Sequence, residues 1–86
     1  MAVIRLDNFE RALKKLPRDA QLHTETQINR MEEDPRDSRL HIKKLGEPYK
    51  NIFSFRITRN YRVLFYFDTK NNIILFDVDN RKDVYR

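Results

Sequence analysis

The second half of the chain holds the pattern that most constrains the fold: three apolar segments separated by very short polar turns. The segments cover residues 52–58, 61–67 and 73–78, and they are rich in the aromatic and β-branched residues typical of strands. The turns at residues 58–60 and 68–72 are too short for the crossover connection that parallel neighbours require. The pattern therefore predicts three sequential antiparallel strands.

The first half of the chain has the spacing of helices instead. Residues 1–6 suit a short opening strand, after which apolar residues recur at steps of three and four, namely Phe9, Ala12, Leu13 and Leu16. That spacing gives a helix one apolar face. We expect Asp7 or Asn8 to cap this helix and Pro17 to end it. A second helix is predicted over residues 19–33.

These elements predict an α+β fold in which two N-terminal helices pack on one face of a mainly antiparallel sheet. The sheet consists of the short N-terminal strand and the three-strand C-terminal meander. A chain of 86 residues is enough for one core, so we expect a single domain, residues 1–86. The connector between the two halves, residues 36–51, contains the one glycine, Gly46. A loop this long is expected to be partly structured or functional.

The composition favours a cytoplasmic protein. No apolar run approaches the roughly 20 residues of a membrane-spanning helix, and the N-terminus lacks the apolar stretch of a signal peptide. The chain has no cysteine, so neither a disulfide nor a thiolate metal site supplements the core. We therefore expect no membrane partner.

Positive charge is concentrated in one part of the chain. The formal net charge is +5, and residues 38–62 hold seven Lys or Arg residues against one acid, Glu47, a local charge of +6. A solvated loop with an exposed hairpin and an anion-binding surface explain this concentration equally well. If the partner is RNA, the residues expected to contact it are Lys43, Lys44, Lys50, Arg59, His41 and Lys82.

Several kinds of site are excluded by motifs that the sequence lacks. It has no glycine-rich phosphate loop, no histidine pair at metal-ligand spacing and no Ser or Cys in a nucleophile context. These absences argue against nucleotide hydrolysis, zinc chemistry and acyl transfer. We expect no metal and no small-molecule cofactor. His23 is expected on a helix surface, whereas His41 lies in the basic connector.

Arginines on strands and near the C-terminus are the remaining candidates for chemistry. Cleavage of RNA without a metal needs a base for the 2′-hydroxyl proton, cations to stabilise the charged phosphorane and an acid for the leaving oxygen. Arginine suits the cationic task because its planar group binds phosphate bidentately. The candidates are Arg56, Arg62 and Arg81, and Tyr85 is a candidate for stacking on a base or for proton transfer.

A structural role is the alternative for each of these residues. An arginine on a strand often protects a sheet edge from aggregation, and a terminal tyrosine often covers the core. The length of the turn between the strands also matters. A two-residue turn would place Arg56 and Arg62 on opposite faces of the sheet, and one more residue would bring them to the same face. The sequence leaves both arrangements open.

Two segments resemble signatures of a known family. The hairpin sequence FRITRNYRVLF, residues 55–65, and the C-terminal string NRKDVYR, residues 80–86, are similar to the R-x-x-x-x-YRV and HRKDVYR motifs of RelE-like toxins. Residues 40–46 also resemble the approach to that hairpin in the family. Length and element order agree, so the chain resembles the RelE/ParE superfamily of bacterial toxins over nearly all of its length.

The resemblance implies roles for individual residues. Arg62 corresponds to the arginine of a Tyr-Arg pair that binds phosphate in the nuclease branch. Arg81 corresponds to a second active-site arginine, and Tyr85 to the C-terminal tyrosine of that branch. Arg56 matches less closely, because its position depends on the length of the turn.

Two features depart from the family pattern. Asn80 stands where histidine is common, so a histidine acid or base is absent there and proton transfer would fall to other groups. The paired strand lysines of some members are not matched either, since residues 53–55 are Phe, Ser and Phe. The connector holds the candidates to replace them, which are Lys43, Lys44 and Lys50.

The resemblance implies the toxin of a type II toxin–antitoxin system, with a cognate antitoxin as partner. The nuclease branch implies a ribosome-dependent, metal-independent endoribonuclease, an mRNA interferase that cleaves mRNA in the ribosomal A site and inhibits translation. The ParE branch implies instead a non-enzymatic inhibitor of DNA gyrase. An inactive relative that acts as a corepressor with its antitoxin is a third alternative.

Overall fold

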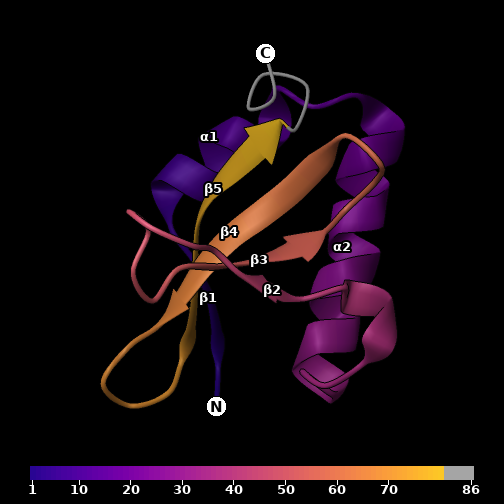
Figure 1. Ribbon diagram of the computed structural model, residues 1–86. Coiled ribbons are helices and arrows are strands. Elements are labelled where there is room, and N and C mark those ends of the chain that lie inside the picture. Colours follow the sequence, from indigo (N-terminus) through magenta and orange to yellow (C-terminus); the bar gives the residue numbers. More distant parts are fainter. Residues whose placement is uncertain (81–86) are drawn as a thin grey trace.

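A computed structural model describes residues 1–80 of the chain (Figure 1). Its elements follow one another in this order: β1 (Val3–Arg5), α1 (Asp7–Lys14), α2 (Arg18–Glu33), the 3-10 helix η1 (Ser38–Leu40), β2 (Lys43–Lys44), β3 (Phe53–Arg56), β4 (Tyr61–Phe67) and β5 (Ile73–Asn80). The predicted helices and meander strands are confirmed. No helix within these residues is long and apolar enough to cross a membrane.

The strands form one five-stranded sheet in the order β1-β5-β4-β3-β2. β1 runs parallel to β5, and the other neighbours are antiparallel, which confirms the predicted mainly antiparallel sheet. β2 was not predicted. It is a two-residue edge strand that the connector contributes beside β3, so the connector is partly structured, as its length suggested.

Both helices lie on one face of the sheet, behind it in Figure 1. The core between the layers is built from apolar residues of both helices, η1 and three strands, with Phe9, Phe55 and Phe65 fully buried at its centre. Burying such a side chain stabilises the fold by about 1.5–3 kcal/mol. The apolar alternation that predicted the strands therefore supplies the face that the helices cover.

The start of each helix differs from the prediction. Leu6 occupies the capping position of α1 and makes no side-chain cap, and α2 starts at Arg18, directly after Pro17. Asn8 instead donates its side-chain amide to the carbonyl oxygen of Phe76 on β5, at 2.9 Å. A tertiary hydrogen bond to the sheet thus takes precedence over the local cap that the sequence suggested.

Candidate nucleic-acid interface

The register of the β3–β4 hairpin settles which way its two arginines point. Arg56 lies directly opposite Arg62, and Arg62 lies opposite Asp79 on β5. Residues directly opposite one another in an antiparallel pair share a face of the sheet. The helix-facing positions next to them are Phe55 and Val63, both fully buried in the core. The arginines therefore lie together on the face turned away from the helices, and we call Arg56, Arg62 and Asp79 the arginine row.

Like charges directly opposite each other on neighbouring strands destabilise a sheet, typically by a few tenths to about 1 kcal/mol. Arg56 and Arg62 form such a pair of like charges within the β3–β4 hairpin. Asp79, opposite Arg62 on β5, offsets part of the repulsion. An anion bound over the row would relieve the repulsion. The geometry therefore suits a phosphate-bearing ligand better than a purely structural surface.

Arg62 is held tightly by the fold. Only 6% of the residue is exposed. Its Nε donates to the hydroxyl of Ser54 at 2.8 Å, and its Nη2 donates to the carbonyl oxygen of His41 at 2.7 Å. Ser54, on the neighbouring strand, is itself fully buried. Arg62 thus places a buried positive charge below the surface and fastens the connector to the sheet.

Two residues fix the connector beside the arginine row. His41 adopts the left-handed conformation, with φ of 48°, which costs a non-glycine residue about 1–2 kcal/mol. Its carbonyl oxygen accepts the bond from Arg62. Gln27 of α2, which is 5% exposed, donates its side-chain amide to the carbonyl oxygens of Arg39 at 2.9 Å and of Arg56 at 2.7 Å. α2 therefore positions both the connector and the end of β3.

Arg56 is more accessible than Arg62. The residue is half-buried, and its Nε is buried without a hydrogen-bond partner in the part of the chain that the structure describes. Leaving a buried donor unsatisfied costs about 1–3 kcal/mol. The fold thus keeps a guanidinium at the row without using its full hydrogen-bonding capacity.

The predicted RNA-binding residues divide into separate groups. Lys43 lies opposite Ser54, on the face of the arginine row, and is exposed. Lys44 lies opposite Phe53, so it points to the other face, and together with Lys50 it lines a shallow pocket of about 450 Å³ in the turn that follows β2. Arg59 is exposed in the turn between β3 and β4.

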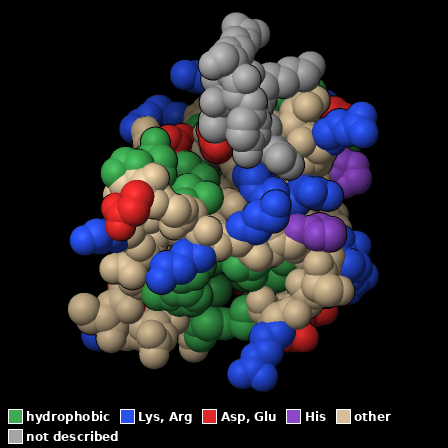
Figure 2. Space-filling model, viewed as in Figure 1, with side chains coloured by type: hydrophobic (Ala, Val, Ile, Leu, Met, Phe, Trp, Pro, Cys, Tyr) green, Lys and Arg blue, Asp and Glu red, His purple; other side chains and the backbone are tan. Residues whose placement is uncertain are grey.

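Lysine, arginine and histidine side chains gather in the middle of the face that turns away from the helices, with apolar side chains below them (Figure 2). His41 is exposed at the end of η1, beside the arginine row that its carbonyl oxygen contacts. Of the predicted site residues, the structure therefore brings together Arg56, Arg62, Lys43 and His41. The remaining candidates, Arg81, Lys82 and Tyr85, lie outside the described residues.

Ser54 and Gln27 were not anticipated as site residues. Each is a buried polar side chain that bonds to a residue of the arginine row, Gln27 to Arg56 and Ser54 to Arg62. Ser54 stands at a polar position of an alternating strand, and Gln27 stands beside the apolar residue Ile28 in α2. Neither pattern differs from that of an ordinary surface residue, so only the tertiary contacts identify them.

A cluster of ion pairs lies on the helix side of the sheet. Arg5 of β1 forms ion pairs with Glu10 at 2.8 Å and with Glu25 at 2.7 Å, and its guanidinium lies 5.4 Å from the ring centre of Phe9. The hydrogen bond from Arg5 lowers the pKa of Glu25 below its usual value, against the opposing effect of burial. This cluster joins β1, α1 and α2.

The remaining charged contacts are local. The Arg39 guanidinium lowers the pKa of Asp37 to about 2, chiefly through side-chain hydrogen bonds at the start of η1. Within residues 1–80, no three His, Asp or Glu side chains are grouped so that they could hold a metal ion.

Solved structures with this fold are toxins and toxin–antitoxin complexes. A chain of the RelB–RelE antitoxin–toxin complex from Methanococcus jannaschii is 26% identical, with a TM-score of 0.77 over 96% of this chain and 95% of that one. A chain of the RelBE2 complex from Mycobacterium tuberculosis is 24% identical, with a TM-score of 0.73 over 93% and 96%. The YoeB/ParE toxin from Agrobacterium tumefaciens is 11% identical, with a TM-score of 0.73 over 93% and 98%.

The fold is thus that of the toxin superfamily that includes RelE. This level of the resemblance noted in the sequence is confirmed, and the branch is not decided. Within this class, the chain belongs to the family described as "Phage derived protein Gp49-like", which matches residues 11–82. None of the curated proteins is significantly similar to it in sequence.

Proposed function

We propose that residues 1–86 form a single cytoplasmic toxin domain that cleaves mRNA on the ribosome without a metal. The observation that carries the proposal is the arginine row, in which Arg56 and Arg62 share the face of the sheet that turns away from the helices. The row lies beside the exposed Lys43 and His41. Such a group of cations suits the phosphodiester backbone of RNA.

The proposed reaction is attack of a ribose 2′-hydroxyl on the adjacent phosphorus. The bond from phosphorus to the 5′-oxygen of the next nucleotide breaks, which leaves a 2′,3′-cyclic phosphate and a 5′-hydroxyl. Negative charge grows on the phosphoryl oxygens in the transition state, and preorganised cations at that position lower the barrier. Arg56, as the more accessible guanidinium, is proposed to contact these oxygens.

Arg62 has a different part in this proposal. Because its Nε and Nη2 already bind Ser54 and His41, it contributes its charge from below the surface and keeps the connector in place. A charge in a partly buried position acts more strongly than one in bulk water. Arg81 and Tyr85 are proposed to complete the site as a further cation and as the group for base stacking or proton transfer, on the strength of the sequence motif alone.

A cognate antitoxin is the proposed protein partner. The similar chains from Methanococcus jannaschii and Mycobacterium tuberculosis come from structures described as toxin–antitoxin complexes. We propose that this chain is likewise neutralised by a partner protein that covers the arginine row, and that its targets when released are the ribosome and the mRNA in its A site.

Inhibition of DNA gyrase is the second candidate function. One of the similar structures carries the description YoeB/ParE toxin, and the resemblance assigns ParE-like relatives to gyrase. The same fold therefore accompanies two activities. An inactive relative that serves as a corepressor is the third candidate.

Induced expression in a bacterial host tests these candidates. Our proposal expects growth arrest together with new mRNA 5′ ends near start codons, and it expects Arg62→Ala and Arg81→Ala to relieve the arrest. Intact transcripts with accumulated DNA breaks would favour gyrase inhibition. Absence of any growth defect would favour the corepressor.

A further inference from the structure

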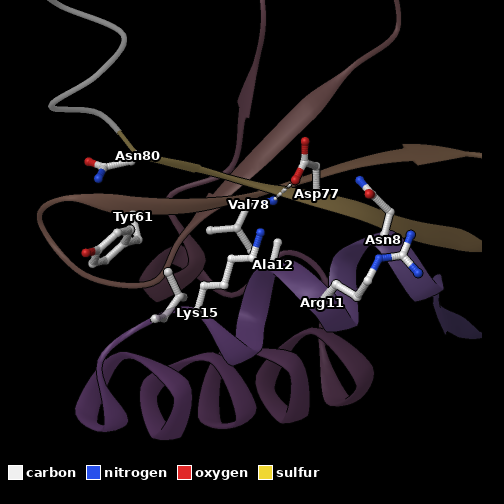
Figure 3. Close-up of a pocket in the computed structure, with 9 residues that line it drawn as sticks. Asn8, Arg11, Ala12, Lys15, Tyr61, Asp77, Val78 and Asn80 are labelled. Atoms are coloured by element: carbon white, nitrogen blue, oxygen red, sulfur yellow. Dashed lines mark hydrogen bonds between the residues drawn. The ribbon is translucent and has the colours of Figure 1, made fainter.

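A separate pocket lies between α1 and β5, with a volume of about 460 Å³. Arg11 of α1 and Lys15, which directly follows α1, approach it from one side, Tyr61 from the start of β4, and Asp77 and Asn80 from β5 (Figure 3). Residues four apart on a helix lie on the same side of it, so the two cations enter the pocket together. The proposed cleavage site uses none of these side chains.

The pocket is positively charged. Arg11 and Lys15 are exposed, and neither takes part in an ion pair within residues 1–80. The carboxylate of Asp77 accepts a hydrogen bond from the backbone N–H of Val78 at 2.8 Å, and in Figure 3 it points away from α1. The lining therefore carries two cations, Arg11 and Lys15, against one carboxylate, Asp77.

The pocket and the arginine row are joined by β4 and β5. Tyr61 precedes Arg62 on β4, and Asn80 follows Asp79 on β5, so the pocket and the row lie at the same end of the sheet, on its two opposite faces. β1 pairs only with residues 73–75 of β5, and no other described strand covers the edge beyond them. An extended chain that contacts the row can pass over this edge and reach the pocket.

We propose that this pocket binds a backbone phosphate of the same single-stranded RNA, away from the scissile position. Arg11 and Lys15 would hold the phosphate, and the half-buried ring of Tyr61 offers a surface for a neighbouring base. RNA fits better than an acidic protein segment because the pocket lies across the edge of β5 from the row and pairs cations with an aromatic ring. This inference rests on the proposed function.

The test compares two double variants of equal charge. Arg11→Gln with Lys15→Gln removes both pocket cations, and Lys14→Gln with Arg18→Gln removes one lysine and one arginine that do not line the pocket. All four side chains are exposed. The readout is binding of a fluorescently labelled single-stranded RNA oligonucleotide to the full chain, without ribosomes, over a series of salt concentrations.

The pocket variant should bind the oligonucleotide at least about fivefold more weakly, and its salt dependence should flatten. Each phosphate that is no longer neutralised reduces the slope of log affinity against log salt by about 0.7 for a single strand, so loss of the one proposed phosphate contact should reduce it by about 0.7. The control variant should keep the wild-type slope. Equal losses in both variants, no loss in either, or a wild-type protein that does not bind the oligonucleotide would overturn the proposal.

A cleavage assay on programmed ribosomes separates this inference from the proposed function. If wild-type protein cleaves mRNA and the pocket variant binds RNA normally, the pocket is not an RNA site while the nuclease stands. If the pocket variant loses RNA binding but the wild type never cleaves, the RNA site stands and the nuclease proposal fails. An acidic peptide that loses affinity for the pocket variant while RNA does not would assign the pocket to a protein partner, which also overturns the inference.

Discussion

Two groups of arginines in this molecule have opposite surroundings. Arg5, on the helix side of the sheet, forms ion pairs with Glu10 and Glu25. Arg56 and Arg62, on the other side, lie opposite each other on neighbouring strands, and the acceptors of Arg62 described above are the neutral oxygens of a hydroxyl and a carbonyl group. At Arg5 two carboxylates surround one guanidinium, whereas in the arginine row two guanidinium groups lie beside one carboxylate, Asp79.

The difference separates an arginine that joins elements of the fold from arginines that are candidates for binding an anion. Two carboxylates that neutralise an arginine, as at Arg5, connect secondary-structure elements and leave little positive electrostatic potential to attract an anionic ligand. Placing two guanidinium groups side by side costs stability and creates an attractive field for an anion. Residue type is the same in both places, so the contrast comes from the neighbours, which are glutamates of α1 and α2 at Arg5 and a second arginine on the adjacent strand at Arg56 and Arg62.

The largest expected effect comes from a pair of single variants, Arg56→Met in the arginine row and Arg5→Met on the helix side of the sheet. Arg56→Met should lower mRNA cleavage on ribosomes by about 100-fold, the typical cost of removing a group that stabilises the transition state. Its free energy of unfolding should stay level or rise by up to about 1 kcal/mol, because like-charge repulsion is relieved. Cleavage kinetics and urea unfolding measure the two quantities.

Arg5→Met should show the reverse. Loss of two ion pairs between partly exposed groups should reduce the free energy of unfolding by about 0.5–2 kcal/mol, and cleavage by the folded fraction should remain. If Arg56→Met destabilises the protein as much as Arg5→Met does and leaves cleavage intact, the distinction between the two groups is lost.

Gln27→Leu should have the next largest effect. It removes the amide that donates to the carbonyl oxygens of Arg39 and Arg56, and leaving buried acceptors unsatisfied costs about 1–3 kcal/mol. Cleavage should fall by more than the unfolded fraction explains, since β3 and the connector lose their common anchor. Gln21→Leu is the control, because its amide bonds only to the turn between the helices, and its cleavage rate should be unchanged.

Lys43→Gln and Lys44→Gln form a matched pair on the two-residue strand β2. Lys43 shares the face of the arginine row and Lys44 does not. We expect Lys43→Gln to slow cleavage about fivefold, which corresponds to roughly 1 kcal/mol, and Lys44→Gln to have little effect. Equal cleavage rates for the two variants in the ribosome assay would show that cleavage does not depend on which face of the sheet the lysine occupies.

The smallest expected effect concerns pH. The pKa of Glu25 is lowered in the folded protein, so its ion pair with Arg5 stabilises the fold above the unfolded-state pKa of about 4.3. That contribution disappears as the pH falls through the lower folded-state pKa. Glu25→Gln should therefore be less stable than the wild type near pH 7, by less than about 1 kcal/mol. The two unfolding curves should converge in acid, and a constant difference across this range would refute the assignment.

Most of the fold follows from patterns in the sequence. Alternation and short turns predict β3, β4 and β5, because each strand has to bury one face against the helices. β2 escapes prediction because its two residues are both lysine, and only its pairing with β3 makes it a strand. The predicted cap of the first helix was wrong because Asn8 bonds to the sheet rather than to its own helix.

The candidate site was predictable in type but not in arrangement. The sequence identified Arg56 and Arg62 and left open whether they share a face, since that depends on the turn between them. It gave no indication that Arg62 is buried or that Ser54 and Gln27 hold the site together, because these facts depend on contacts between distant segments. The roles of Arg81, Lys82 and Tyr85 remain predictions.

The chemistry of the cleaved ends tests the central claim most directly. Purified protein would be added to ribosomes carrying a defined mRNA, and the fragments analysed for their terminal groups. Attack by the 2′-hydroxyl at the arginine row predicts a 5′-hydroxyl on the downstream fragment and a 2′,3′-cyclic phosphate, or its 3′-phosphate product, on the upstream one, with Arg56→Met inactive. Downstream fragments with 5′-phosphates, or mRNA that stays intact with the wild-type protein, would contradict the account.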